Sequence, residues 1–203
     1  MSDCRLIIFL KAPRAGEVKT RLASGLGPAG ALHAYELLVA KLLGSLATLE
    51  GVELRFAPDD AAGEIARWLR KGWSAQAQGT GDLGGRLCRA FREAFESGAR
   101  RVVIIGSDCP DVMPVDIESA WAAMAAHDVV LGPAVDGGYW LVGLRALHES
   151  IFRGIRWSTS SVLAETLAIC QRNGLTVHRL RELHDVDTAE DWQHFLQARQ
   201  NLA

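Results

Sequence analysis

One aspartate stands directly after a short β-branched run near the middle of the chain. Residues 102–105 are consecutive apolar residues without helical spacing, which predicts a central strand buried on both faces of a parallel sheet. Gly106 ends this run, and Asp108 follows two residues later. Open α/β sheets bind their ligands beyond the carboxyl ends of the strands. A carboxylate there could hold Mg2+ or Mn2+, which prefer oxygen ligands, against a phosphate. The alternative is that Asp108 caps the following turn.

A basic stretch follows the first apolar run of the chain. Residues 6–10 predict the first buried strand, and after it only Glu17 opposes four basic side chains. A basic loop that contains a glycine, here Gly16, can bind a pyrophosphate through backbone N–H groups and side-chain charge together. The alternative is a solvated surface loop. The four basic residues are Lys11, Arg14, Lys19 and Arg21.

Two further stretches combine glycines with a carboxylate. Residues 79–85 contain Asp82 and Gly84, and such a loop either allows close approach of the backbone to a ligand or is only a flexible connection. Residues 136–138, Asp-Gly-Gly, are a strong turn signal before a strand that returns antiparallel from Tyr139. A structural hairpin explains these glycines. It does not explain why a second carboxylate and two aromatic residues follow a strand end.

The last third of the chain adds an aromatic residue and two more aspartates. Trp157 precedes Ser158, which we expect to be the N-cap of the next helix, so that Trp157 is either a core residue or a stacking platform. Asp185 and Asp187 lead into a terminal helix that Thr188 is suited to cap.

The periodicity between these stretches predicts the elements that position them. Strands alternate with helices, which is typical of an α/β fold with a mostly parallel, mixed sheet, here as a single domain over residues 1–203. The expected strands lie at residues 6–10, 52–57, 74–78, 102–105, 128–133, 139–144 and 175–180. The expected helices lie at residues 29–49, 61–71 and 116–127, with others ending near 97 and 170 and a last one after 188.

Composition limits the possible partners. The chain has 203 residues, 49% of them hydrophobic, and a formal net charge of -2, which gives no electrostatic case for nucleic acid or an anionic membrane. None of its 4 cysteines forms a C-x-x-C pair, so neither a disulfide framework nor a thiolate zinc site is indicated. The apolar run at the N-terminus is too short for a signal peptide or a membrane span. We therefore expect a soluble, cytoplasmic protein with reduced thiols.

Six motifs in order carry a family resemblance that covers nearly the whole chain. They resemble a bacterial family assigned to glycosyltransferases with the nucleotide-diphospho-sugar transferase (GT-A) fold, a three-layer α/β sandwich distantly similar to molybdopterin and phospholactate guanylyltransferases. The motifs are KAPRAGEVKTRL at 11–22, GDLGGRL at 81–87, GSDCP at 106–110, GPAVDGGYWL at 132–141, WST at 157–159 and DVDTAEDW at 185–192.

The resemblance implies a nucleotide over the first half of the sheet and roles for individual residues. It implies phosphate contacts from Lys11, Lys19 and Arg21, with Gly16, Asp82 and Gly84 in the nucleotide-binding loops. It makes Asp108 the metal carboxylate, and Asp187, or alternatively Asp185, a second ligand of Mg2+ or Mn2+. The acceptor or sugar would face Asp136, Gly137, Gly138, Tyr139 and Trp157. The chain departs from nucleotidylyltransferases in lacking their paired glycines in the first loop, and from many glycosyltransferases in having one aspartate rather than D-x-D.

Three functions are compatible with this reading. In glycosyl transfer from a nucleotide sugar, a divalent metal with Lys19 and Arg21 neutralises the departing diphosphate, and Asp136 orients or deprotonates the acceptor hydroxyl. In nucleotidyl transfer to a phosphorylated small molecule, the same cations stabilise the α-phosphate of a nucleoside triphosphate. The third function is that of a non-catalytic nucleotide-binding module.

Overall fold

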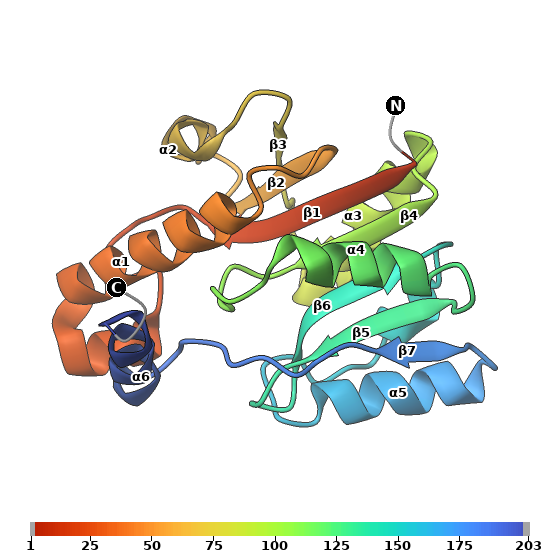
Figure 1. Ribbon diagram of the computed structural model, residues 1–203. Coiled ribbons are helices and arrows are strands. Elements are labelled where there is room, and N and C mark those ends of the chain that lie inside the picture. Colours follow the sequence, from red (N-terminus) through yellow and green to blue (C-terminus); the bar gives the residue numbers. More distant parts are fainter. Residues whose placement is uncertain (1–2, 201–203) are drawn as a thin grey trace.

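The alternation of apolar side chains along the first strand determines the layers of the molecule. The computed structural model describes residues 3–200 (Figure 1). On strand β1 (Cys4–Lys11), Leu6, Ile8 and Leu10 are buried in one hydrophobic cluster, whereas Ile7 and Phe9 are buried in another on the opposite face. Because successive side chains of a strand point to opposite faces, both faces of the sheet are covered.

Seven strands form one mixed sheet in the order β3-β2-β1-β4-β6-β5-β7. Strand β6 is antiparallel to both of its neighbours, as expected from the Asp-Gly-Gly turn, and the other pairs are parallel. The carboxyl ends of β1 and β4 therefore lie at one edge, next to the beginning of β6. The remaining strands are β2 (Val52–Ala57), β3 (Ser74–Ala77), β4 (Arg101–Ile105), β5 (Val129–Pro133), β6 (Tyr139–Leu144) and β7 (Val177–Arg179).

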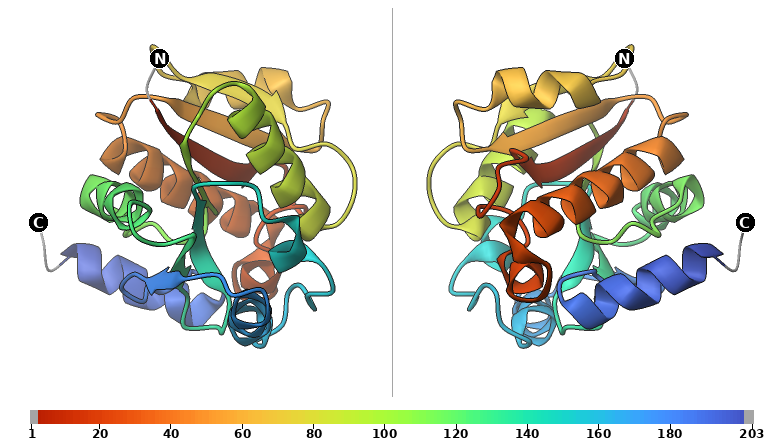
Figure 2. Two further views of the ribbon diagram at one scale, coloured as in Figure 1. Left: turned by 90° about the vertical axis from the view of Figure 1, so that its right-hand side faces the viewer. Right: turned by 90° about the vertical axis from the view of Figure 1, so that its left-hand side faces the viewer.

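Helices cover the two faces of this sheet and complete the three layers of an α/β fold (Figure 2). On one face lie α1 (Thr20–Ser45), α2 (Ala62–Ile65) and α4 (Pro114–Ala123). On the other lie α3 (Leu83–Glu96), α5 (Val162–Arg172) and the 3-10 turn η2 (Glu149–Phe152). No helix within residues 3–200 is long and apolar enough to span a membrane.

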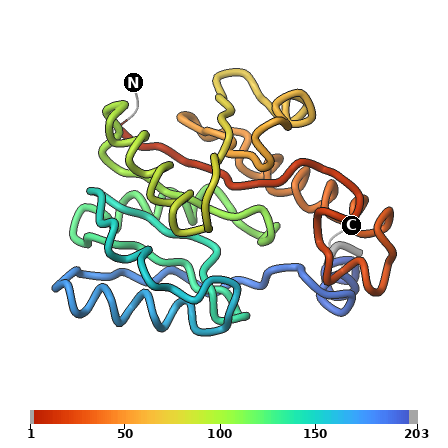
Figure 3. Tube along the Cα trace, turned by 180° about the vertical axis from the view of Figure 1, so that it is seen from behind, coloured from red at the N-terminus to blue at the C-terminus, as the bar shows by residue number. Residues whose placement is uncertain are grey.

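The last helix packs against the beginning of α1 and forms a third, smaller cluster (Figure 3). Trp192 and Phe195 of α6 (Ala189–Gln200) pack with Leu22 of α1. A Cβ atom on Gly25 would lie only 2.9 Å from the Cβ of Ala189, so this glycine allows the two helices to approach closely. The packing brings the segment before α6 to the edge of the sheet where β1 and β4 end.

This packing explains the main error in the predicted helices. The expected helix at 29–49 begins at Thr20 instead, and a non-helical residue, Gly27, kinks it just before Pro28. Residues 20–26 are therefore helical rather than part of the basic loop, because Leu22 is buried against α6.

Other boundaries were also predicted wrongly. The expected helix at 61–71 is a short α-helical turn followed by the 3-10 turn η1 (Ala66–Trp68), and the strand expected at 175–180 pairs over three residues only. Helix α4 begins at Pro114, whose fixed φ suits the first helical position, and ends at Ala123 rather than near residue 127. Ser158 is not an N-cap, because α5 begins four residues later.

Candidate active site

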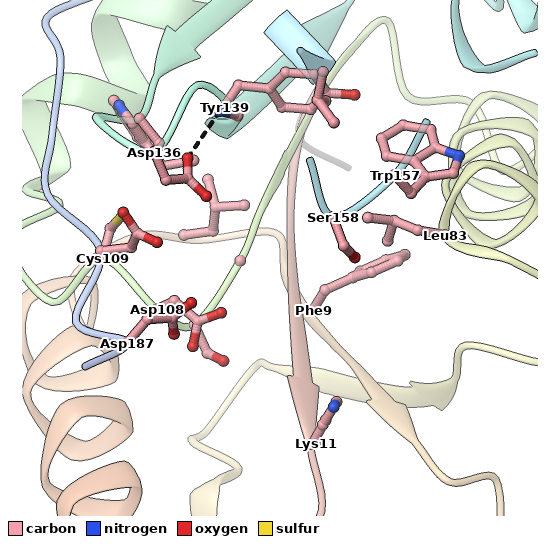
Figure 4. A pocket seen from close by; sticks show the side chains of 18 of the residues that line it. Phe9, Lys11, Leu83, Asp108, Cys109, Asp136, Tyr139, Trp157, Ser158 and Asp187 are labelled. Atoms are coloured by element: carbon pink, nitrogen blue, oxygen red, sulfur yellow. Dashed lines mark hydrogen bonds between the residues drawn. The ribbon is translucent and has the colours of Figure 1, made fainter. Parts of the chain in front are cut away.

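A cavity of about 790 Å3 lies beyond the carboxyl ends of β1 and β4 and beside the start of β6. Its wall has two different sides (Figure 4). Carboxylates gather on one side, where Figure 4 shows Asp108 and Asp187 next to each other. Phe9, Leu83 and Trp157 form the apolar side opposite. This is the edge at which the sequence places Asp108.

One lysine joins two of the carboxylates. The ammonium of Lys19 lies 2.7 Å from Oδ1 of Asp187 and is also ion-paired with Oδ1 of Asp108. Its side chain is only 3% exposed. Burial alone would lower the pKa of Lys19, but the two carboxylates outweigh burial and raise it above the ordinary value. The lysine is therefore charged and holds together groups that are distant in the sequence.

The backbone fixes this arrangement from two directions. The carbonyl oxygen of Asp108 accepts a hydrogen bond of 3.0 Å from the backbone N–H of Val186, which joins the end of β4 to the segment before α6. The carboxylate of Asp191 accepts hydrogen bonds from the N–H groups of Asp187 and Thr188, while the Thr188 hydroxyl accepts one from Asp191 N–H. The predicted cap at Thr188 is thus confirmed, and it holds Asp187 in place.

Asp185 has a different environment from Asp187. It lines the same cavity, but burial, followed by the neighbouring charge of Asp136, raises its pKa to about 6. Cys109 packs in the core beside it, and burial raises the pKa of its thiol. It is Asp187, not Asp185, that shares a cation with Asp108.

Asp108 and Asp187 could supply two of the ligands of a divalent cation. Two oxygens in contact with one ammonium nitrogen lie no more than about 5 Å apart, close to the separation of up to about 4.2 Å between two ligands of one Mg2+ ion, whose metal–oxygen bonds are about 2.1 Å. Within residues 3–200 no group of three or more His, Cys, Asp or Glu residues has the geometry of a metal site. Phosphate oxygens and water would have to complete the coordination, as is usual for Mg2+.

The four basic residues after β1 have different environments. Lys11, Lys19 and Arg21 line the cavity. The Tyr35 hydroxyl fixes the Lys11 backbone, donating to its carbonyl oxygen at 3.0 Å and accepting from its N–H at 2.8 Å. Arg14 is bound instead to Glu64, at 2.7 Å, and to Asp60. Gly16 is exposed and does not line the cavity.

The second glycine-rich loop has mainly structural contacts. The Asp82 carboxylate caps α3 by accepting a 2.8 Å hydrogen bond from Gly85 N–H. A Cβ on Gly84 would lie 2.6 Å from the carbonyl oxygen of Phe152, so this glycine permits close packing. The cavity is lined by their neighbour Leu83 and not by either residue.

Sequence reasoning missed several lining residues. Phe9, Leu83, Gln78 and Arg86 all face the cavity. Gln78 is buried and donates to the carbonyl oxygens of Leu10 and Arg55, while its own carbonyl accepts from Arg86. The period-two pattern of β1 could have identified Phe9 as a strand-end side chain, but nothing local indicates that Gln78 is buried.

The Asp-Gly-Gly turn and the loop after η2 are in contact with each other, and both contribute residues to the wall of the cavity. Asp136 lines the cavity, and its Oδ1 accepts a 2.8 Å hydrogen bond from Gly138 N–H. The ring of Tyr139 also lines the cavity and lies edge-on to Trp157, with ring centroids 6.5 Å apart. The Tyr139 hydroxyl is buried beside Thr166, and burial raises its pKa, so it does not face a ligand.

Gly137 is required where these two segments touch. Its φ is 88°, and a Cβ there would lie 2.2 Å from the carbonyl oxygen of Ser160. We expect Gly137→Ala to lower the free energy of unfolding by about 2 kcal/mol or more, because it adds a backbone clash to the cost of a left-handed alanine.

Gly154→Ala is the matched control for this prediction. Gly154 has φ 71° but no heavy atom within 4 Å of the Cβ position. It should lose only about 1 kcal/mol in urea unfolding. Equal losses for both variants would mean that the two segments can separate without cost.

Comparison with known proteins identifies the family and the fold of this chain. The chain matches a family model described as "Uncharacterized protein conserved in bacteria (DUF2064)" over residues 43–159. No curated protein sequence matches it. A crystal structure from Desulfovibrio desulfuricans G20, of a protein provisionally assigned as a nucleotide-diphospho-sugar transferase, is 35% identical, with a TM-score of 0.91 over 99% of this chain and 89% of that one. The expected GT-A fold is thereby confirmed.

Two more distant structures share the fold. CMP:2-keto-3-deoxy-manno-octonic acid synthetase, in complex with CTP, is 12% identical, with a TM-score of 0.61 over 98% of this chain and all of that one. Molybdopterin-guanine dinucleotide biosynthesis protein A from Archaeoglobus fulgidus is 13% identical, with a TM-score of 0.59 over 97% and 99% of the two chains.

Proposed function

Because this chain belongs to the bacterial family DUF2064 and is 35% identical to a protein assigned to nucleotide-diphospho-sugar transfer, we propose that it is a metal-dependent glycosyltransferase with a nucleoside-diphosphate sugar as donor. The observation that carries the proposal is that Asp108 and Asp187 lie close enough together to share one cation, here the Lys19 ammonium. This position lies at the sheet edge where α/β proteins bind nucleotides.

The chain's own residues have distinct tasks in this reaction. When Mg2+ or Mn2+ is bound, it neutralises charge that builds on the diphosphate as the sugar leaves. Asp108 and Asp187 hold the ion. Lys11 and Arg21 bind phosphate oxygens, and Lys19 adds positive charge beside the two carboxylates. Asp136, on the same side of the cavity as Asp108 and Asp187, orients the acceptor hydroxyl and accepts its proton.

The state of the basic loop favours a diphosphate over a triphosphate. Arg14 is occupied by Glu64 and Asp60, and Lys19 by two carboxylates. Lys11 has no ion pair within the described part of the chain, and Arg21 is 68% exposed and 3.9 Å from Asp187. Lys11 and the largely exposed Arg21 are thus the two cations left to meet phosphates, which suits two phosphates with one metal ion better than three.

Nucleotidyl transfer is the second candidate, because the fold is shared with a synthetase that binds CTP. Thermal unfolding with Mn2+ separates the two. We expect UDP-glucose, GDP-mannose or ADP-glucose, and the matching diphosphate, to raise the melting temperature by about 5 to 10 °C at 100 times Kd. A rise with CTP or GTP alone would favour nucleotidyl transfer. Binding without turnover over a broad panel of acceptors would indicate a non-catalytic module.

A further inference from the structure

Two non-glycine residues in the described part of the chain have a left-handed backbone conformation, and both line the cavity. Within residues 3–200, Lys19 (φ 48°) and Ser158 (φ 63°) are the non-glycine residues with positive φ. Such backbone strain is concentrated at functional sites. Lys19 already has a role between Asp108 and Asp187, whereas Ser158 has none in the function proposed above.

We infer that Ser158 binds the donor, with its hydroxyl hydrogen-bonded to a hydroxyl group of the transferred sugar. The inference rests on the proposed function and extends it to one further residue and to the sugar part of the substrate. Figure 4 shows the Ser158 hydroxyl directed into the cavity near Phe9 and Trp157, opposite Asp108 and Asp187.

The turn itself does not need a serine. The Ser158 hydroxyl has no hydrogen-bond partner within residues 3–200, and the hydrogen bonds of the loop come from its neighbours. Thr159 Oγ1 donates to the carbonyl oxygen of Arg156 at 2.7 Å and lies 2.8 Å from Ser161 Oγ, which donates to Glu165. Glycine at position 158 would satisfy the same backbone without strain.

Contacts on both sides keep the loop in this conformation. Leu163 N–H donates to the carbonyl oxygen of Gly137 at 3.0 Å, and the missing side chain of Gly137 leaves room for the backbone of Ser160. Gly84 likewise leaves room for the indole of Trp157. Ser158 is thus presented from a fixed loop rather than from a mobile one.

The chemistry of the loop points to the sugar rather than the phosphates. Residues 157–161, Trp-Ser-Thr-Ser-Ser, carry no charge, whereas Lys11 at the end of β1 and Arg21 at the start of α1 bring positive charge to the cavity. A hydroxyl both donates and accepts a hydrogen bond, which suits another hydroxyl. The neighbouring indole of Trp157 suits the apolar C–H face of a sugar ring.

The test compares Ser158→Gly and Ser158→Ala with the unaltered protein. Calorimetry in MnCl2 measures binding of UDP-glucose, GDP-mannose and ADP-glucose, with UDP, GDP and ADP as internal controls. We expect both variants to bind the preferred nucleotide sugar about 5- to 10-fold more weakly, and its diphosphate unchanged, because one neutral hydrogen bond is lost. Ser158→Gly should also raise the melting temperature by about 2 to 4 °C, since it relieves the strain, while Ser158→Ala should not.

In Ser158→Gly, sugar binding should weaken while the melting temperature rises. If Ser158→Gly raises stability and leaves sugar binding unchanged, the residue is a strained turn only. Equal weakening of sugar and diphosphate would place the contact at the phosphates and overturn the assignment to the sugar. A failure of the unaltered protein to bind any of the six compounds would overturn the proposed function, and this inference with it.

Discussion

Asp108→Asn is expected to abolish the Mn2+-dependent binding of nucleotide sugars. The amide keeps the size of the side chain but removes the charge that a divalent ion requires. Outer partners of metal ligands already contribute 10- to 100-fold to affinity, so loss of a direct ligand should weaken binding about 100-fold or more. The fold should be retained, because the Asp108 side chain is 51% exposed and Lys19 keeps its ion pair with Asp187. Calorimetric titration of UDP-glucose, GDP-mannose and ADP-glucose with and without MnCl2 measures the effect.

Asp111→Asn is the matched control for this experiment. Asp111 lies three residues further along the chain, pairs with Lys41 and does not line the cavity. It should bind metal and nucleotide sugar like the unaltered protein. An affinity of Asp108→Asn within about twofold of that control would remove Asp108 from the metal site, whatever its position at the strand end.

The sequence predicts the sheet better than it predicts the helices, for a physical reason. Strand 52–57 was predicted at its observed bounds because apolar residues that alternate with polar ones between two turns are a local signal. The start of α1 was missed because its local glycines, Gly25 and Gly27, indicate a loop. Its helical conformation depends on packing against α6, more than 160 residues away in the sequence, and no local pattern reports that contact.

The same distinction applies to the site. Asp108 could be identified from its place after a strand, but Asp187 could be associated with it only through the family resemblance. The four basic residues after the first strand look alike in the sequence, which does not show that Arg14 is bound to Glu64 and Lys19 to two carboxylates. Ser158 was expected to cap a helix because the sequence shows its hydroxyl and not its backbone conformation. Long-range pairing and dihedral angles are what the sequence leaves out.

Lys19→Met is expected to destabilise the folded protein at neutral pH and to make its stability dependent on divalent cations. Methionine fills a similar buried volume but leaves Asp108 and Asp187 without their shared cation, beside Asp136 and Asp185. Breaking a fully buried pair costs roughly 3 to 5 kcal/mol, and because Asp108 is half exposed we expect about 2 to 3 kcal/mol at pH 7.5.

The pH dependence of this loss has a defined sign. Without the ammonium, Asp108 and Asp187 repel each other and also Asp185, whose pKa burial and neighbouring charges already raise to about 6. Protonated carboxyl groups do not repel one another, so the loss should be small near pH 4 and grow as the pH rises through the raised pKa of Asp185. Urea unfolding at pH 4.5 and pH 7.5 measures this difference.

Lys41→Met shows which part of the effect belongs to the cavity. Lys41 pairs with a single exposed carboxylate, Asp111, and also donates to the carbonyl oxygen of Pro110. Its replacement should cost under about 1 kcal/mol and should not respond to Mn2+. In Lys19→Met, by contrast, millimolar MnCl2 should restore most of the lost stability, because an ion bound to the folded state alone shifts unfolding by mass action. If Mn2+ leaves Lys19→Met as unstable as before, Asp108 and Asp187 do not form a divalent cation site, and the metal-dependent mechanism loses its structural basis.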